Sequence, residues 1–83
     1  MESLHELPNI GGILEQKLVQ VGIGTPQQLR ELGSKEAFLK IRLIDHTACL
    51  HMLTALEGAV QGVRKTELSS QVKAELRAFY NSL

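Results

Sequence analysis

The spacing of the apolar residues is the feature that most restricts how this chain can fold. Apolar side chains recur every three or four residues, as at Ile10, Leu14, Leu18 and Val21, whereas no segment alternates long enough for a β-strand. Glycine, proline or hydroxyl residues interrupt the pattern at short intervals. Such a pattern predicts several short helices that pack together. We therefore expect an all-α fold of five short helices.

The first two predicted helices are separated by clear start and stop signals. Gly22 follows the first helix, where a left-handed residue commonly ends a helix. Thr25 then fits an N-cap, Pro26 the first helical position and Gln28 the second partner of a capping box. This second helix is short and stops at Gly33.

The third helix is predicted to open at Ser34, with Glu36 in its first turn, where the helix dipole favours an anion. Asp45 and Thr47 compete as the cap of the fourth helix, which we expect to end between residues 60 and 64. The predicted buried side of the third helix is Ala37, Phe38, Ile41 and Ile44, and that of the fourth is Cys49, Leu53, Leu56, Val60 and Val63.

The last helix is predicted to begin after a serine cap at Ser69 or Ser70. Its apolar residues form a wide stripe, because they repeat at helical spacing while the polar residues between them face elsewhere. The stripe consists of Val72, Leu76, Phe79, Tyr80 and Leu83.

Length and composition indicate one small domain over residues 1–83. The hydrophobic fraction of 43% argues against a disordered tail, and nine basic residues balance nine acidic ones. A net charge of zero is unlike a dedicated nucleic-acid domain and gives no electrostatic attraction to a membrane. No apolar run is long enough for a membrane span, and no signal peptide is recognised. With a single cysteine, and so no internal disulfide, a cytoplasmic protein is expected.

The N-terminal third resembles the helix-hairpin-helix family. Leu7-Pro8-Asn9-Ile10-Gly11 leads into one helix, and residues 21–26 lead into another. In that family a tight glycine turn presents backbone N–H groups to a DNA phosphate, as the start of a helix can. Asn9 replaces the first glycine of the family's turn, and asparagine tolerates a left-handed backbone. The resemblance implies a nucleic-acid contact at Asn9, Ile10, Gly11 and Gly12, helped by Lys17.

The sequence as a whole is similar to the C-terminal domain of TfoX-type proteins, which are bacterial regulators linked to DNA-transformation competence. Four segments carry this resemblance in order: residues 7–11, residues 22–29, residues 33–37 and residues 55–62. Together they span roughly residues 3 to 80. The resemblance implies a helix-hairpin-helix or SAM-like bundle and a regulatory role. Lys65 stands after Arg64, where the family often has an aromatic residue.

Charge decides between two expected modes of action. Between residues 1 and 29, three glutamates oppose Lys17 alone, whereas DNA affinity grows with the number of cations at the phosphates. Arg64 and Lys65 are the one adjacent basic pair. We expect a module that acts by protein–protein contact, through a partner chain or self-association. Weak, sequence-independent DNA binding through the turn is the rival.

A ridge of small residues on the fourth helix favours close approach by another element. The expected neighbour is the first or the fifth helix, and the alternative is a second copy of the chain. The ridge consists of Ala55, Gly58, Ala59 and Gly62. Gly58 and Gly62, with Arg64 and Lys65, make the candidate interaction surface.

No pattern of catalytic or metal-binding residues stands out. His46 and Cys49 share a helix face, but His51 points elsewhere and His5 is distant, which falls short of a zinc site. Cys49 lies on the apolar stripe, so we expect it to be buried. Glu57 has apolar neighbours and is expected to tether a backbone amide. We therefore expect a non-enzymatic protein with no cofactor, no metal and no small-molecule substrate.

Overall fold

The computed structural model describes residues 3–83. Within this range the chain forms five α-helices, two short 3-10 helices and no β-strand. The all-α class and the five helices are therefore confirmed, whereas the 3-10 helices were not predicted. The elements follow in the order η1 (Leu4–Glu6), α1 (Gly12–Gln20), α2 (Pro26–Leu32), α3 (Ser34–Ile44), α4 (Leu50–Gln61), η2 (Lys65–Glu67) and α5 (Ser70–Asn81).

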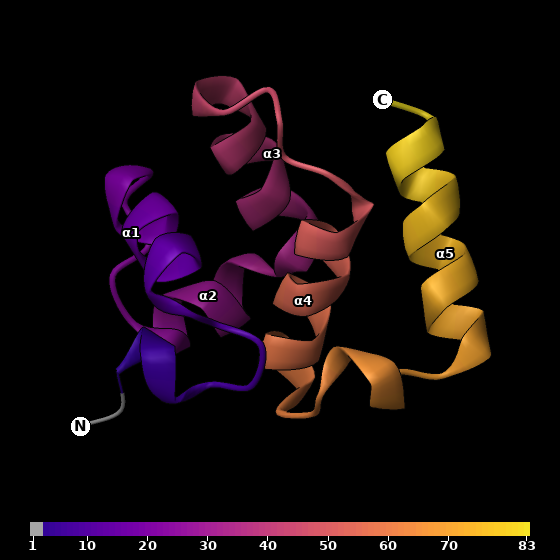
Figure 1. The fold of residues 1–83 in the computed structure, drawn as a ribbon, viewed down its shortest axis with the longest axis horizontal. Helices are drawn as coiled ribbons and strands as arrows, with labels where there is room; N and C mark the ends of the chain where they lie inside the picture. The colour runs from indigo at the N-terminus through magenta and orange to yellow at the C-terminus, as the bar shows by residue number, and fades with distance from the viewer. Residues whose placement is uncertain (1–2) are drawn as a thin grey trace.

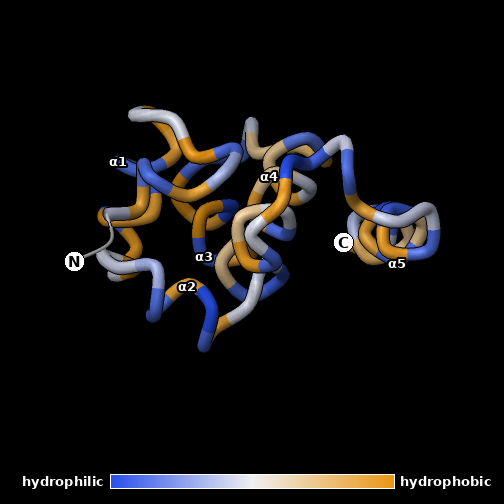
Figure 2. Tube along the Cα trace, turned by 90° about the horizontal axis from the view of Figure 1, so that it is seen from below, coloured by the Kyte–Doolittle hydropathy of each residue, from blue (hydrophilic) through white to orange (hydrophobic). Residues whose placement is uncertain are grey.

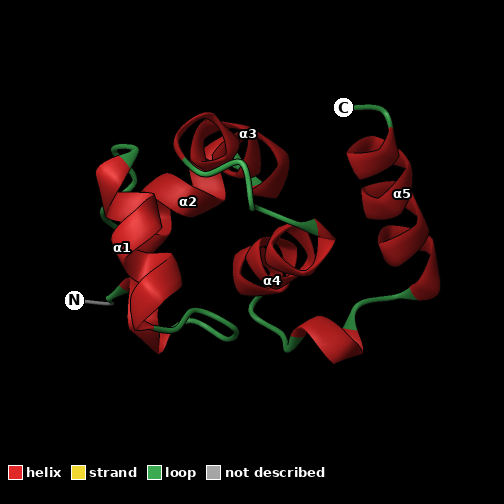
Figure 3. Ribbon diagram, turned by 45° about the horizontal axis from the view of Figure 1, so that its top comes forward, coloured by secondary structure: helices red, strands yellow, loops and turns green. Residues whose placement is uncertain are grey.

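Helix α4 lies in the middle of the molecule. Figures 1 and 3 show α1, α2 and α3 on one side of it and α5 on the other. Its main neighbour is α3, and it also contacts α5, η2 and α2. The sequence indicated that the fourth helix packs against the first or the fifth. The contact with the fifth helix is confirmed, but the larger contact with α3 was not predicted. The molecule measures 32 × 26 × 20 Å.

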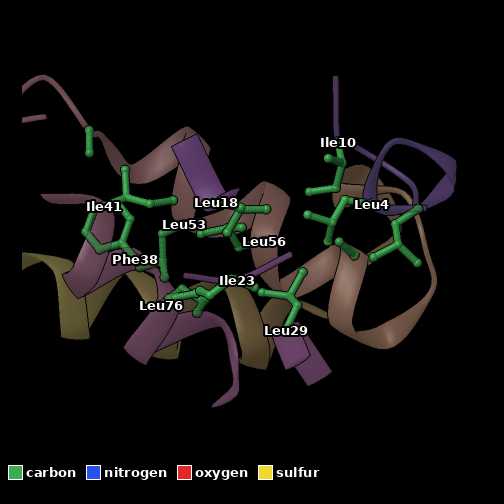
Figure 4. Packing of buried hydrophobic residues seen from close by; sticks show 14 of the residues in the cluster. Leu4, Ile10, Leu18, Ile23, Leu29, Phe38, Ile41, Leu53, Leu56 and Leu76 are labelled. Carbon is green, nitrogen blue, oxygen red and sulfur yellow. The ribbon is translucent and has the colours of Figure 1, made fainter. Parts of the chain in front are cut away.

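One continuous core joins the N-terminal segment to all five helices (Figure 4). Every α-helix contributes at least one buried apolar side chain, and each fully buried one stabilises the fold by about 1.5–3 kcal/mol. The largest fully buried side chains are Leu4, Leu18, Leu29, Phe38, Ile41, Leu53 and Leu56. Ile10 and Val21, which spacing assigns to the first helix, lie just outside α1, although Ile10 is still buried.

The predicted caps of α2 and α5 are confirmed. The N–H of Gln28 donates to Thr25 Oγ1 at 3.1 Å, and Pro26 is the first residue of α2. Gln28 Oε1 accepts from the N–H of Gly24 at 2.7 Å, one residue before the cap. At α5, Ser69 Oγ accepts the N–H of Val72 at 3.1 Å. Helix α4 ends at Gln61, within the predicted range.

The starts of α3 and α4 differ from the prediction. Gly33 is the N-cap of α3, with a φ of 90° that favours glycine, and Ser34 is the first helical residue. Neither Asp45 nor Thr47 caps α4, because Asp45 Oδ1 accepts from the N–H and hydroxyl of Thr47 and shapes the connection instead. The N-cap of α4 is Cys49.

Three predicted core residues are exposed, so these predictions were wrong. Cys49 precedes the first turn of α4 and faces solvent, and Ala48 is buried in its place. Ile44 is 52% exposed, because the last turn of α3 extends past the layer that α4 covers (Figure 1). Leu83 is 47% exposed and follows the last turn of α5.

Helix α5 packs on the rest of the molecule through its apolar stripe. Figure 2 shows α5 end-on, with its hydrophobic residues mainly on the side that faces the other helices. Leu76 is buried, and the Tyr80 ring lies 6.0 Å from that of Phe38 on α3. The Arg42 guanidinium lies over Tyr80, 5.7 Å from the ring centre. Helix α5 is therefore held by a few side chains.

No helix within residues 3–83 has the length and hydropathy to cross a bilayer.

Candidate interaction surfaces

The turn at Asn9 is fastened to the end of α4 by its own side chain. Asn9 has a φ of 70°, in the left-handed region that the sequence indicated. Its Nδ2 donates to the carbonyl oxygens of Val63 at 3.0 Å and of Ala55 at 3.4 Å. Its Oδ1 accepts the N–H of Lys65 at 3.0 Å. The side chain thus satisfies backbone groups at the C-terminal end of α4, beyond its backbone role in the turn.

Gly58 makes this approach feasible. A Cβ on Gly58 would lie 2.4 Å from Asn9 Nδ2 and 2.7 Å from the Val63 carbonyl oxygen. The small residues Ala55, Gly58 and Ala59 are buried, so this part of the ridge lies inside the molecule. Gly62 is exposed and ends α4 in a left-handed conformation, with a φ of 77°.

The start of α1 combines exposed backbone with an acidic side chain. Gly11 and Gly12 are exposed, whereas Ile10 is buried in the core. Glu15 lies in the first turn, where its carboxylate accepts the N–H of His5 at 3.2 Å and lies 3.0 Å from His5 Nδ1. This carboxylate stabilises the positive end of the α1 dipole and would repel a phosphate there.

Lys17 points to a different part of the molecule. Its ammonium pairs with the Asp45 carboxylate at the end of α3. The Lys17 contact, with the hydroxyl and N–H of Thr47, holds the pKa of the Asp45 carboxyl far below its usual range. The pair therefore ties the second half of α1 to the end of α3.

Arg64 and Lys65 lie beside the Asn9 turn, because the Lys65 backbone is hydrogen-bonded to Asn9. Both residues are exposed. The structure thus brings together Asn9, Ile10, Gly11 and Gly12 with the adjacent basic pair, and it leaves Lys17 at the other end of α1.

An apolar surface that sequence reasoning missed lies at the end of α3. Leu43 is 87% exposed, the highest value among the large apolar residues described, and Ile44 follows it. We call these two residues the α3 tip. Lys40 and Arg42 are one turn or less away on the same helix. The signal was in the sequence, because Leu43 stands two residues from Ile41, nearly opposite the buried face of the helix.

A cavity of about 450 Å³ lies at the opposite end of α3, between the start of α3, α4 and α5. We call it the α5 groove. Its carboxylates come from three helices, through Glu36, Glu57 and Glu75, and Lys35 is the basic residue on its wall. The remaining lining residues are Leu32, Gly33, Ser34, Val72 and Leu76.

Glu57 organises the floor of the α5 groove. Its Oε1 accepts from the hydroxyl of the buried Ser34 at 2.5 Å, and its Oε2 accepts from the Gln61 amide at 2.6 Å. The sequence predicted a tether to a backbone amide, whereas these two hydrogen bonds of Glu57 go to side chains. Within residues 3–83, no group of three or more His, Cys, Asp or Glu side chains is arranged to hold a metal ion.

Comparison with known proteins gives consistent matches. The family described as the TfoX C-terminal domain matches residues 1–80. Protein Sxy of Escherichia coli (strain K12) is 35% identical over 82 residues. Those residues are 99% of this chain and 39% of Sxy, so the chain spans about two fifths of that relative's length.

Two crystal structures from Listeria monocytogenes have the same fold. One, titled as an uncharacterized protein in a triclinic form, is 52% identical with a TM-score of 0.97, covering 98% of this chain and 92% of that one. The other, titled as a protein of unknown function in a tetragonal form, is 53% identical with a TM-score of 0.93, covering 95% and 96%.

Proposed function

Because this chain belongs to the TfoX C-terminal domain family, we propose that it is a non-enzymatic regulatory module that acts by protein–protein contact. The family resemblance connects such a role to bacterial competence. The observation that carries the mode of action is the exposure of the α3 tip, where Leu43 is 87% exposed. Exposed apolar residues with a polar rim are typical of protein interaction sites.

Capture of partners by an immobilised chain tests this function. Leu43→Glu places a charge at the centre of the α3 tip and should abolish binding of a specific partner, because burying an unpaired carboxylate is costly. Ile13→Glu is the matched control, since Ile13 is 74% exposed and belongs to α1, not to the α3 tip. The captured protein must then bind the purified chain. A partner that binds wild type and Leu43→Glu equally would contradict the proposal.

DNA binding is the second candidate, and the position of Arg64 and Lys65 beside the Asn9 turn favours it. Two cations next to the free amides at the start of α1 supply the elements of a phosphate contact. The Glu15 carboxylate in the same turn opposes that contact. This candidate is sequence-independent and weak.

A labelled DNA duplex titrated at low and moderate salt distinguishes the second candidate. Phosphate-driven binding weakens with a log–log slope of about −0.9 per neutralised phosphate. The double variant Arg64→Glu/Lys65→Glu should remove it, and Arg77→Glu, an exposed charge reversal on α5, should retain it. Absence of binding at low salt would exclude DNA as the target.

A further inference from the structure

We propose that the α5 groove of one molecule receives the α3 tip of a second copy, so that the chains associate head to tail. This inference rests on the proposed function, because it names the partner that the α3 tip contacts. The groove and the tip lie at opposite ends of the same helix. A contact between them therefore leaves one free tip and one free groove on the pair, and further copies can add.

Charge complementarity is the first argument. Three glutamates and one lysine line the groove, which makes it acidic. Lys40 and Arg42 flank the tip, and the nearby Asp45 is neutralised by Lys17. Lys40 shares a second cavity with Glu31, and Arg42 keeps its charge near the tip while it lies over the Tyr80 ring. The chain as a whole has no net charge, so copies do not repel one another.

The helix dipole does not by itself account for these charges. It favours Glu36 in the first turn of α3 and Arg42 in the last turn. Glu57 and Glu75, however, reach the groove from α4 and α5. The dipole also gives no reason for an exposed leucine. Moreover, the groove contains the positive end of α3, and the tip ends in the negative end of the same helix, so the two dipoles align when copies stack.

Size and apolar content are the second argument. The groove volume of about 450 Å³ is within the range of about 300–1,000 Å³ that binding pockets show. Its wall includes Leu32, Val72 and Leu76. The Leu43 side chain can thus lie against apolar surface, while the exposed Lys40, three residues before it, reaches the carboxylates on the rim.

Sedimentation equilibrium of the purified chain, from micromolar to millimolar concentration, tests the inference. We expect the mean mass of wild type to rise with concentration past twice the 9.2 kDa of one chain. High salt should weaken the association, because charged groups form the rim. Leu43→Glu disables the tip, and Glu75→Lys disables the groove, so each variant alone should associate at least about tenfold more weakly.

An equal mixture of the two variants gives the sharper result. Each variant keeps one working end, so the mixture should form a one-to-one dimer that does not grow. The controls are Ile13→Glu for the tip and Arg77→Glu on α5 for the groove, both at exposed positions. They should associate as wild type does, and far-ultraviolet circular dichroism should show that every variant is folded.

Three outcomes would overturn the inference: a wild type that stays monomeric at every concentration, a wild type that stops at a dimer, or a mixture that fails to restore pairing. A chain that is monomeric in this assay but loses a different protein partner through Leu43→Glu would overturn self-association and leave the proposed function intact.

Discussion

At the scale of single residues, Asn9 connects the first turn of the chain to backbone groups 46 to 56 residues later. Asn9→Gly retains the left-handed backbone but removes these hydrogen bonds, so we expect a loss of about 2 kcal/mol in the free energy of unfolding. Asn9→Ala should cost about 1 kcal/mol more, because alanine disfavours a positive φ. Urea unfolding measures both values. Equal stability of Asn9→Ala and wild type would show that the side chain contributes nothing.

Gly58 gives a second prediction, on packing. Gly58→Ala should destabilise the fold by about 2 kcal/mol, although alanine normally gains about 1 kcal/mol over glycine in a helix. The reason is that the new Cβ collides with Asn9 Nδ2 and with the Val63 carbonyl oxygen. Gly12→Ala is the control, because a Cβ there meets nothing within 4 Å. Chemical denaturation should show Gly12→Ala at or slightly above wild-type stability.

The ion pair between Lys17 and Asp45 gives a third prediction, on acid stability. The pKa of Asp45 is lowered in the folded chain, so the pair stabilises the fold above the ordinary Asp pKa of 3.8. That contribution is lost as the pH falls below this value. The urea midpoint of wild type should therefore fall more steeply than that of Asp45→Asn between about pH 5 and pH 2. Parallel curves for the two proteins would contradict it.

The presence of asparagine at position 9 predicted the left-handed backbone conformation there, but it did not predict which groups the Asn9 side chain would contact. A left-handed asparagine is a local property, so the turn sequence was sufficient to indicate it. Its partners, such as Val63 and Lys65, are distant in sequence, and only the packing of α4 brings them close. Lys17 was assigned to the turn by proximity in sequence, yet its partner is on α3.

At the scale of elements, α5 has fewer buried residues than α3 and α4, the other two helices of more than ten residues. It has one buried residue, Leu76, whereas α4 has five. Because local opening depends on buried apolar contact, the amides of α5 should exchange with deuterium faster than those of α4. Leu76→Ala should widen this difference. Equal protection of the two helices would show that α5 opens only with the whole domain.

Start signals at helices were predictable where a side chain caps its own helix. Thr25 and Ser69 accept hydrogen bonds three residues on, so the pattern needs no tertiary contact. The start of α4 was missed because Asp45, a strong candidate for a cap, is used by Lys17 and Thr47. The apolar periodicity also assigned Cys49 to the buried face of α4. Cys49 is instead the N-cap that precedes the helix, and its thiol is exposed.

At the scale of the whole molecule, one core extends from Leu4 to Leu76. A chain of this size with a single core should unfold in one cooperative transition. Tyr80 on α5 is the one tyrosine, and the chain has no tryptophan, so its fluorescence reports α5 alone. This signal and circular dichroism should give the same urea midpoint. An earlier fluorescence transition would show that α5 separates first.

Sequence reasoning predicted the fold class because apolar spacing and caps are local. The surfaces were harder to predict, because exposure depends on where each helix ends relative to its neighbours. Ile44 lies in the last turn of α3, which extends past α4, and Leu43 lies nearly opposite the buried face of the same helix. The α5 groove requires carboxylates from three helices, which no single segment of the sequence contains.

The fastening of Asn9 to Val63 and Lys65 also determines when this protein can fold during its synthesis. The first turn cannot reach its final form until the ribosome has released residues 56 positions later. At about 5–20 residues per second, that delay is about 3–11 s. Until then the apolar N-terminal residues, such as Leu4, Leu7 and Ile10, remain without their final contacts in the core.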